Sequence, residues 1–573
     1  MLLAYDYEVF EQDWLVVIID VLTNQKKVIV NDDNALKEFY QSHIDYIWVS
    51  FNGRNYDQFI KKAILCGFDP YKVSQFIITK KRKGWEYSNL FNQMQLYNYD
   101  VYKGITDVSL KTLEAYMGHN IHETSVPFNI KRKLNPQEIL ETIKYCTYDV
   151  TELIEVFKER MDDFETHLAM INEFELPLKH ISKTSAQLIS VILGSVKKEY
   201  DDEWDVYLPD TLRLSKYKVV ADFFLRNKST TNKLVIDVAG VEHTFSDGGL
   251  HGAKPKFTYI CKPDEMMILA DATSLYPTLM LVYDLLSRSI SDKKRFKHIY
   301  DMNIELKRLD DPRRPIYKLI CNTTYGCSGD KYNSMYDPRN RRLVCIFGQV
   351  LLLDLIEKLE PYIRLVQSNT DGILFIIKRK DFDVIDDIVH DWEERTGLTM
   401  EFKYYEKIFQ KDVNNYVAVP YGPLYDEKGK PRWKGKGAYV KKLSRLDYDL
   451  PIVNEALINY MVKNIPIEDT INSCNELIKF QKIFKLTSNY EFVMHNGVKY
   501  WNKSYRVFAS KNKSDTYLGK SKCEGCTIEK FANSPDHCFI LNSDINGVDL
   551  PGDLDKEWYI NLAYDRLNQF MGG

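Results

Sequence analysis

The sequence has no excess of charge of one sign. Its 573 residues contain 77 Lys and Arg against 81 Asp and Glu, which gives a formal net charge of −4. This balance excludes a globally basic surface for binding nucleic acid, so any such contact must come from local clusters of Lys and Arg.

Long hydrophobic runs are also lacking. The best apolar stretch, residues 343–356, is interrupted by Gln349 and Asp354 and is shorter than the roughly 20 residues that a membrane-spanning helix needs. The first ten residues include Asp6 and Glu8 and have no basic segment, unlike a secretory signal. We therefore expect a soluble, cytoplasmic protein that has no membrane partner.

Cysteine is sparse and irregularly spaced. Ten cysteines in 573 residues do not form the dense pattern of a disulfide framework, so we expect reduced thiols in a cytosolic compartment. Cys523 and Cys526, followed by His537 and Cys538, offer enough ligands for a tetrahedral zinc ion. Adjacent His and Cys are awkward ligands for one ion, however, and zinc at Cys523 and Cys526 is not expected.

The chain is long and apolar enough for several domains, because 45% of its residues are hydrophobic and 13% aromatic. It opens with apolar runs separated by turn residues, which predicts strands of an α/β domain at residues 2–5, 14–21, 27–30 and 46–51. Asn135-Pro136-Gln137-Glu138 supplies a cap, a first-turn proline and an acid, so we predict a helix from there toward Phe174.

In the middle of the chain a carboxylate follows directly on a predicted buried strand. The apolar run Met266 to Ala270 leads into Asp271-Ala272-Thr273-Ser274-Leu275-Tyr276-Pro277. Metal sites favour such a carboxylate at the end of a strand. When this segment is taken alone, a strand that ends in an ordinary capping aspartate is the better interpretation.

A second carboxylate is predicted at the tip of a hairpin. Residues 363–375 have the pattern of a strand, a tight polar turn that contains Asp371, and a second strand, although Asp and Gly are what purely structural turns use as well. Between the two carboxylates, Lys318, Asn322 and Tyr325 share one face of a predicted helix that Gly326 ends. A solvated amphipathic helix is the alternative. The break at Asp311-Pro312 separates it from a preceding basic helix.

Further carboxylates cluster in the N-terminal third. Asp6 and Glu8 are two apart on a predicted strand, so their side chains face the same side. Asn52-Gly53-Arg54-Asn55-Tyr56-Asp57 follows a strand and opens a helix, and Tyr145 and Asp149 lie four apart on the capped helix. Each short motif recurs by chance, but their order ahead of the central carboxylates strengthens the joint interpretation.

Together these segments resemble the motifs of family B DNA polymerases. Asp-x-x-Ser-Leu-Tyr-Pro, Lys-x-x-x-Asn-x-x-Tyr-Gly and Thr-Asp are similar to the palm and finger motifs, and Asp-x-Glu, Asn-x-x-x-(Phe/Tyr)-Asp and Tyr-x-x-x-Asp to the exonuclease motifs. The resemblance covers nearly the whole chain, whose length is closest to that of small bacteriophage enzymes. It implies template-directed DNA synthesis with 3′→5′ proofreading, by a monomer that binds primer–template DNA, deoxynucleoside triphosphates and single-stranded DNA.

The same resemblance implies an α/β and α+β multidomain fold, in which an RNase H-like exonuclease domain precedes a right-hand polymerase of palm, fingers and thumb. The domains expected from it are an exonuclease at 1–165, a helical linker or N-terminal part of the palm at 166–245, a palm at 246–285 and 328–445, fingers formed by a helical hairpin at 286–327, and a thumb or C-terminal domain at 446–573.

Two Mg²⁺ or Mn²⁺ ions per site would serve both reactions, because carboxylate oxygens suit these cations. By the resemblance, Tyr145 orients the attacking water, Lys318 neutralises the triphosphate, Asn322 and Tyr325 line the nascent base pair, and Tyr276 blocks a ribose 2′-hydroxyl, with Ser274 and Leu275 in the same nucleotide site. The metal ligands would be Asp271 and Asp371 in one site and Asp6, Glu8, Asp57 and Asp149 in the other.

Contacts to DNA are expected at several further positions. The basic, glycine-rich segment from residue 428 to 442 includes Lys434 and Lys436 and suits contacts with duplex phosphates, with a solvated loop as the alternative. Lys411 and Tyr416 lie where family members carry a basic-plus-tyrosine motif. The segment Asp107 to Leu110 resembles one that holds single-stranded primer ends, or is a plain capped helix start.

One departure from the family pattern occurs at the predicted hairpin tip. The family commonly has Asp-Thr-Asp, whereas this chain has Asn369-Thr370-Asp371, so we expect activity to survive with an altered metal preference possible. The segments between the palm motifs are too short to hold large insertions. This favours an enzyme that extends nucleic-acid primers in phage genome replication. Protein-primed replication, and an exonuclease whose degenerate polymerase half only binds DNA, are the alternatives.

Overall fold

The computed structural model describes residues 1–102 and 108–571. The chain forms two compact units. The first comprises Met1–Thr184, Leu443–Pro451 and Cys474–Trp558, and the second comprises Ser185–Lys442, Ile452–Ser473 and Tyr559–Gly573. The stretch 446–573, predicted as a single C-terminal domain, is thus divided between the two units.

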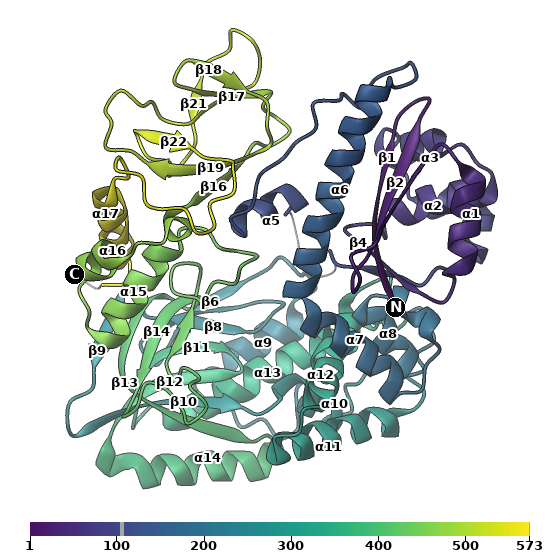
Figure 1. Cartoon of the computed structure of the whole chain (residues 1–573). Helices are drawn as coiled ribbons and strands as arrows, with labels where there is room; N and C mark the ends of the chain where they lie inside the picture. The colour runs from purple at the N-terminus through teal and green to yellow at the C-terminus, as the bar shows by residue number, and fades with distance from the viewer. Residues whose placement is uncertain (103–107, 572–573) are drawn as a thin grey trace. The chain divides into compact units, whose positions relative to one another are not determined.

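The N-terminal part of the first unit is built on a five-stranded mixed sheet with the order β3-β2-β1-β4-β5 (Figure 1). Strand β1 pairs antiparallel with β2 and parallel with β4, and β4 pairs parallel with β5. Four of these strands lie where alternating apolar runs predict them. The strands are β1 (Leu2–Val9), β2 (Trp14–Asp20), β3 (Lys26–Val30), β4 (Ile47–Ser50) and β5 (Asn98–Asp100).

Helix α6 (Pro136–Glu159) packs against β1 and β2 and starts where its sequence predicts. The Asn135 side chain accepts a hydrogen bond from the Glu138 amide at 2.9 Å, and the Glu138 carboxylate accepts one from the Asn135 amide at 2.8 Å. This reciprocal cap confirms the predicted helix start. The helix breaks at Arg160, and α7 (Met161–Glu173) then continues to the predicted end near Phe174.

The second unit contains a ten-stranded sheet with the order β15-β14-β13-β10-β12-β11-β8-β7-β6, in which β9 pairs with β13. Strand β10 lies between β12 and β13, so it is paired along both edges. The strands are β6 (Leu234–Val238), β7 (Val241–Phe245), β8 (Leu250–Ala253), β9 (Phe257–Ile260), β10 (Glu265–Ala272), β11 (Arg364–Thr370), β12 (Gly372–Lys378), β13 (Met400–Asp412), β14 (Asn415–Pro420) and β15 (Lys434–Lys436).

The most apolar stretch of the sequence forms the core helix α13 (Pro338–Leu359), which is buried along nearly its whole length. It contacts α10 (Leu275–Val282), α12 (Arg314–Gly329) and α14 (Phe382–Thr396). In the part of the chain that the structure describes, no helix combines the length and apolarity needed to cross a membrane.

The predicted pair of helices around Asp311-Pro312 is confirmed, since α11 (Lys293–Leu309) packs against α12 across a short connection. The prediction that Gly326 ends the second helix is wrong, because α12 continues to Gly329. Glycine inside an exposed helix turn costs only about 1 kcal/mol relative to alanine, and this amount does not stop a helix that is packed on its other face.

Residues 474–558 add two small sheets to the first unit. One has the order β16-β19-β22 and the other β18-β17-β20-β21. Their inward-facing side chains form one hydrophobic cluster that includes Val493, Tyr505 and Val507. The strands are β16 (Lys482–Lys485), β17 (Phe492–His495), β18 (Val498–Tyr500), β19 (Ser504–Ala509), β20 (Gly519–Ser521), β21 (Glu529–Lys530) and β22 (Cys538–Ile540).

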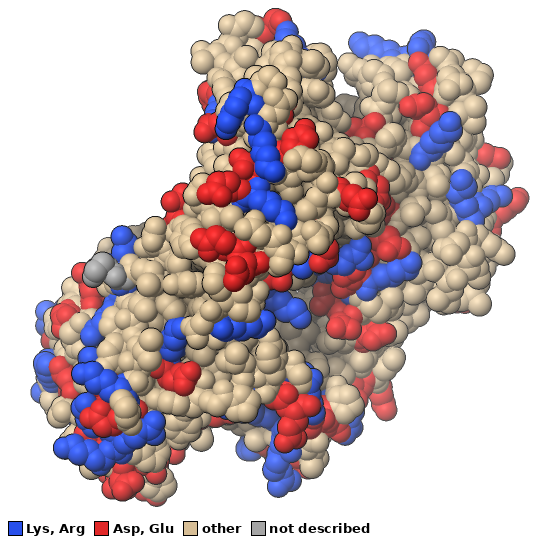
Figure 2. All heavy atoms as spheres, turned by 60° about the vertical axis from the view of Figure 1, so that its left-hand side comes forward, with Lys and Arg blue, Asp and Glu red and all other residues tan. Residues whose placement is uncertain are grey.

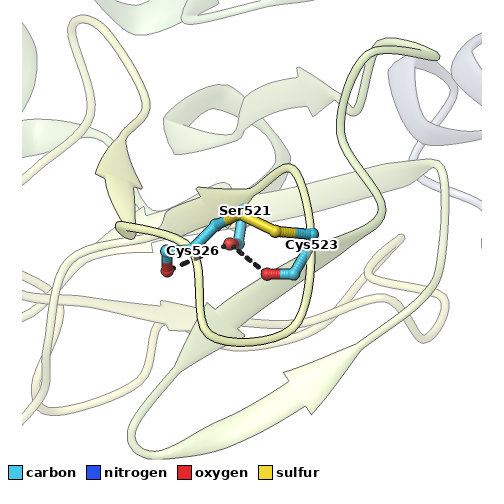
Figure 3. Close-up of a disulfide and its surroundings, with 3 residues drawn as sticks. All are labelled: Ser521, Cys523 and Cys526. Atoms are coloured by element: carbon cyan, nitrogen blue, oxygen red, sulfur yellow. Dashed lines mark hydrogen bonds between the residues drawn. A yellow bond between two sulfur atoms is a disulfide. The ribbon is translucent and has the colours of Figure 1, made fainter.

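The prediction of reduced thiols fails for one pair. Cys523 and Cys526 form a disulfide across the turn after β20, because their Cα atoms lie 5.3 Å apart (Figure 3). The hydroxyl of Ser521 donates to the carbonyl of Cys523 at 3.0 Å and lies 3.4 Å from that of Cys526. The other eight cysteines, all in the described part of the chain, are free.

Arg506 on β19 joins this C-terminal segment to α5 (Leu110–Tyr116). Its guanidinium group is completely buried and donates to the carbonyls of Ala115 and His119, at 3.0 and 2.8 Å. It also donates to the carbonyl of Ser543 at 2.7 Å and to the side chain of Gln481 at 3.0 Å. A charged group with this many acceptors fixes the segment against the end of the helix.

Candidate active sites

The first unit brings all five of its predicted site residues to one cavity of about 710 Å³. Asp6 and Glu8 point to the same side of β1, Asp57 opens α2 (Asp57–Cys66), and Tyr145 and Asp149 lie one turn apart on α6. Three elements that are distant in sequence therefore converge on one set of carboxylates.

The loop before α2 is held rigidly. The Asp100 carboxylate accepts hydrogen bonds from the backbone amides of Asn52 and Arg54, at 2.8 and 3.0 Å. Gly53 is required there, because a Cβ atom at this position would lie 2.1 Å from the Ser50 hydroxyl oxygen. The tight approach of this loop to β4 fixes where the helix starts and so where Asp57 lies.

Burial dominates the electrostatics of this site. Glu8, Asp57 and Asp149 are at most 8% exposed. Burial, followed by the neighbouring carboxylates, raises the pKa of Asp6 and of Glu8 well above the ordinary range. Burial likewise raises the pKa of Asp57 to about 7. The site is therefore short of positive charge and has a high affinity for protons or cations.

Lys111 is a functional candidate that the sequence analysis missed. Its ammonium group donates to the Asp149 carboxylate and, at 3.1 Å, to that of Glu114, which is completely buried. Burial alone would lower the pKa of Lys111, but Asp149 and Glu114 outweigh this effect and raise it. The lysine follows Ser109 and Leu110, so its position directly after a motif-like segment was the available signal.

The carboxylates fit a divalent cation. Ligand atoms of Asp6, Glu8 and Cys146 lie within 4.8 Å of one another, and the buried Oδ1 of Asp57 has no hydrogen-bond partner. Burial and the nearby acids raise the pKa of Cys146 well above its ordinary value. Oxygen ligands alone favour Mg²⁺ or Mn²⁺ over zinc.

Apolar and aromatic side chains form the other walls of the cavity. Phe51 and Tyr102 make an edge-on ring contact at 5.1 Å, and Ile77 and Ile78 lie nearby in the lining. Of the segment expected to hold single strands, residues 108–110 line the cavity, while Asp107 lies outside the described residues. This wall therefore combines aromatic rings with aliphatic side chains.

In the second unit, Asp271 and Asp371 are neighbours. Asp271 is the penultimate residue of β10 and pairs across the sheet with Gly372, the first residue of β12. Asp371 occupies the turn between β11 and β12, and its carbonyl accepts a hydrogen bond from the Ala272 amide at 2.7 Å. Desolvation of the carboxyl group and the neighbouring Asp271 raise the pKa of Asp371.

Two further charged residues, both on β13, are neighbours of Asp271. Lys403 donates to its carboxylate at 2.9 Å, and Glu401 lies directly opposite it in the sheet. Burial alone would lower the pKa of Lys403, but the hydrogen bond to Asp271 prevails and raises it. No feature of the sequence around residue 403 identified this lysine, because the pairing of β13 with β10 brings it there.

The side chain of Asn369 is hydrogen-bonded to the backbone. Its side-chain amide donates to the carbonyl of Val413 at 3.1 Å. The residue is half-buried and lies opposite Gly372 in the hairpin. It therefore supports the turn that presents Asp371.

The predicted nucleotide-site residues gather around an aromatic pair. The rings of Tyr276 and Tyr325 are 4.4 Å apart, and the Tyr325 hydroxyl lies 2.6 Å from the sulfur of Cys345. Ser274 adopts the left-handed conformation, with φ of 49°, and turns the chain from β10 into α10. Such a conformation costs a non-glycine residue about 1 kcal/mol or more and is frequent at functional sites.

The side chains on the predicted face of α12 become more buried along the helix. Lys318 and Asn322 are exposed, and Tyr325, further along the same face, is half-buried against Tyr276. Leu275 is 4% exposed and packs in the core at the start of α10. The ring contact links α12 to the segment that begins with Asp271.

The four predicted DNA contacts fall in two environments. Lys434 and Lys436 lie on the edge strand β15, and their charges act to lower the pKa of Asp371, so both are near that carboxylate. Tyr416 is 3% exposed and belongs to the hydrophobic cluster of the sheet, because the alternation along β14 turns it inward. Lys411 hydrogen-bonds Gln569 at 2.8 Å. Elsewhere, positive and negative side chains are interspersed on the face shown in Figure 2.

No protein-family model matches the sequence, and a search of curated proteins finds no match either. Among solved structures, the chain is similar to the family B DNA polymerase from the hyperthermophilic archaeon Pyrobaculum calidifontis. The match covers 99% of this chain and 77% of that chain, with 13% sequence identity and a TM-score of 0.41.

Proposed function

We propose that this protein is a DNA polymerase that extends a primer at the site of Asp271 and Asp371 and removes 3′-terminal nucleotides at the separate site of the first unit. The observation that carries the proposal is the convergence of three distant segments in the second unit. Asp271 lies beside Asp371 across two paired strands, and Tyr276, five residues after Asp271, contacts Tyr325 on α12.

In the polymerase site, Asp271 and Asp371 would hold two Mg²⁺ ions. Such ions, when bound, neutralise the triphosphate and lower the pKa of the primer hydroxyl. Lys318 is exposed on the face of α12 that carries Tyr325, where its ammonium group can bind the triphosphate. The ring of Tyr276, fixed against Tyr325, forms the wall that excludes a ribose 2′-hydroxyl.

In the nuclease site, Asp6, Glu8, Asp57 and Asp149 would hold the cations that activate water for hydrolysis of the last phosphodiester. Burial, then the neighbouring acids, raises the pKa of Tyr145, so its hydroxyl keeps its proton. This hydroxyl hydrogen-bonds the Asp149 carboxylate, which fixes its position for orienting the attacking water.

We further propose that the enzyme extends ordinary nucleic-acid primers, as expected of a phage replicase. Between Asp271 and Lys318 the chain forms only α10, α11 and the beginning of α12, with short connections. This leaves no space for an inserted domain that would accommodate a priming protein.

The test uses a 5′-labelled primer annealed to a longer template, with Mg²⁺, in the presence and absence of deoxynucleotides. Asp371→Ala should abolish extension and retain shortening, and Asp6→Ala should do the reverse. Loss of a metal-binding carboxylate should cost about a thousandfold in the affected reaction. Asp383→Ala, at an exposed position of α14, serves as the control. Shortening without any extension by the wild type would instead favour a nuclease with a DNA-binding second unit.

A further inference from the structure

Cys345 is a buried thiol of the second unit, and no sequence motif pointed to it. It lies in the middle of α13 and is 1% exposed. Helix α13 packs against both α10, which carries Tyr276, and α12, which carries Tyr325. The thiol is therefore placed behind the aromatic pair that lines the proposed nucleotide site.

Both tyrosines bond to this one sulfur atom through their hydroxyl groups. The Tyr325 hydroxyl lies 2.6 Å from Sγ of Cys345, and the Tyr276 hydroxyl hydrogen-bonds the same thiol. The centres of the two rings are 4.4 Å apart, and the rings are inclined at 44° to each other. Because a single atom bonds both hydroxyls, it fixes the far end of each ring and the angle between them.

The rest of this face of α13 gives the tyrosines less support. Arg341, Cys345 and Gly348 fall at i, i+4 and i+7, so they share one side of the helix. The guanidinium group of Arg341 lies 5.9 Å from the centre of the Tyr325 ring. A Cβ atom added at Gly348 would be in ordinary contact with the Tyr276 ring, at 3.5 Å, so α13 leaves a methyl-sized space behind that ring. The hydrogen bond to the thiol is therefore the specific contact that holds Tyr276 against α13.

We infer that Cys345 positions Tyr276 and Tyr325 and thereby determines how strictly the polymerase distinguishes deoxyribonucleotides from ribonucleotides. The inference rests on the proposed DNA synthesis, in which the ring of Tyr276 excludes the ribose 2′-hydroxyl. A wall rejects one additional oxygen atom only if it does not move back by the size of that atom. The thiol supplies this restraint, because it holds the hydroxyl end of the ring while a methyl-sized space lies behind it.

Cys345 acts through the two tyrosines, because a side chain that is 1% exposed does not reach the substrate. It is therefore a positioning residue. Removal of the sulfur would leave two hydroxyls without this partner and open a space beside both rings. The ring of Tyr276 would then be free to retreat when a ribonucleotide enters, whereas a deoxyribonucleotide would bind as before. Loss of the thiol should thus change the choice of sugar more than the rate of DNA synthesis.

The experiment measures kcat/KM for addition of one deoxynucleotide, or of the matching ribonucleotide, to an annealed primer by the full-length protein. Cys345→Ala should lower the ratio of the two values about tenfold, through a lower KM for the ribonucleotide, and should change kcat/KM for the deoxynucleotide by less than about threefold. Cys345→Ser has nearly the volume of the alanine variant but keeps a hydrogen-bonding atom, so its ratio should stay within about threefold of the wild type. Cys321→Ala removes another thiol that is 1% exposed, on α12, and is the matched control.

Two results would overturn the inference, with thermal unfolding used to verify that each variant is folded. An unchanged ratio in Cys345→Ala would show that the tyrosine pair keeps its position without the thiol. An equal loss in Cys345→Ala and Cys345→Ser would show that the volume of the sulfur matters and its hydrogen bonds do not. A wild type that adds neither nucleotide would contradict the proposed polymerase activity itself, and so is distinguishable from both.

Discussion

Three carboxylates of the proposed nuclease site lie deeper in the protein than those of the proposed polymerase site. Glu8, Asp57 and Asp149 are at most 8% exposed, whereas the side chain of Asp271 is 26% exposed and Asp371 lies at an open hairpin tip. In the buried site the pKa values rise well above the ordinary range, and a lysine is held within the cluster. The two sets of carboxylates thus lie in different settings, one enclosed in the protein and the other at the edge of an open hairpin.

The two sites also differ in the contacts that fix their side chains in place. Asp271 and Asp371 are fixed by the register of adjacent strands in one sheet, so the proposed polymerase site is built within the second unit. The nuclease cavity depends in addition on residues 474–558, which Arg506 binds to the end of α5. A defect in the long-range contact should therefore separate the two activities.

The largest effect is expected from Arg506→Met. The substitution leaves several buried carbonyls without their donor, which should destabilise the first unit by at least about 3 kcal/mol. Urea unfolding of the full chain measures this cost, and shortening of a single strand should fall more than about tenfold while primer extension changes by less than about threefold.

Arg445→Ala is the matched control for that substitution. Arg445 pairs with Glu159 at 2.9 Å in an exposed ion pair, so its loss should cost less than about 1 kcal/mol. If extension by Arg506→Met fell as far as shortening, the proposed polymerase site would not be independent of the packing in the first unit, and the contrast between the two sites would be lost.

Local sequence patterns predicted the parts of both sites that depend on a single element. Alternation placed Asp6 and Glu8 on one face of β1, and the reciprocal cap at Asn135 fixed the start of the helix that carries Tyr145 and Asp149. These features follow from the periods of strands and helices and from capping chemistry, which act over a few residues.

The residues that the sequence did not reveal are those brought in by tertiary packing. Lys111 hydrogen-bonds Asp149, which is 38 residues away in the sequence, and Lys403 hydrogen-bonds Asp271, which is 132 residues away. Tyr416 was expected to contact DNA, but it lies on the inner side of β14, because alternation defines two faces without telling which one is buried. Strand pairing and the direction of the core cannot be read from local motifs.

A smaller effect is expected from the pH dependence of the metal-free protein. The folded-state pKa of Asp57 is raised to about 7, above its unfolded value, so the folded state binds more protons between these two values. Stability is therefore present below the unfolded pKa and is lost as the pH rises through the folded pKa, by an amount on the order of 2–4 kcal/mol. Thermal unfolding in a chelator, at about pH 5 and about pH 8, measures this loss, and Mg²⁺ should restore the stability.

The Asp57→Asn variant tests whether this carboxyl group causes the loss of stability at high pH. Without this buried charge, the metal-free protein should be more stable than the wild type at about pH 8, and it should gain less from Mg²⁺. Asp45→Asn, at an exposed position of the first unit, is the control and should leave both values unchanged. A wild type whose metal-free stability rises between these pH values would show that the carboxylates are already ionised and compensated by other groups.

The smallest effect is expected at Asn369, where the open site has one charge fewer than the Asp-Thr-Asp motif that this segment resembles. Asn369→Asp adds a carboxylate beside Asp371 and removes the hydrogen bond to Val413. In a site as exposed as this one, an added charge changes metal binding by only about 1 kcal/mol, so the Mg²⁺ concentration for half-maximal extension should fall about threefold to tenfold. Asn369→Ala, which removes the same hydrogen bond without adding charge, should leave that concentration unchanged. If both variants lost extension alike, the amide would be needed to hold the hairpin turn, and the polymerase site would depend on its backbone support as strongly as the nuclease site depends on Arg506.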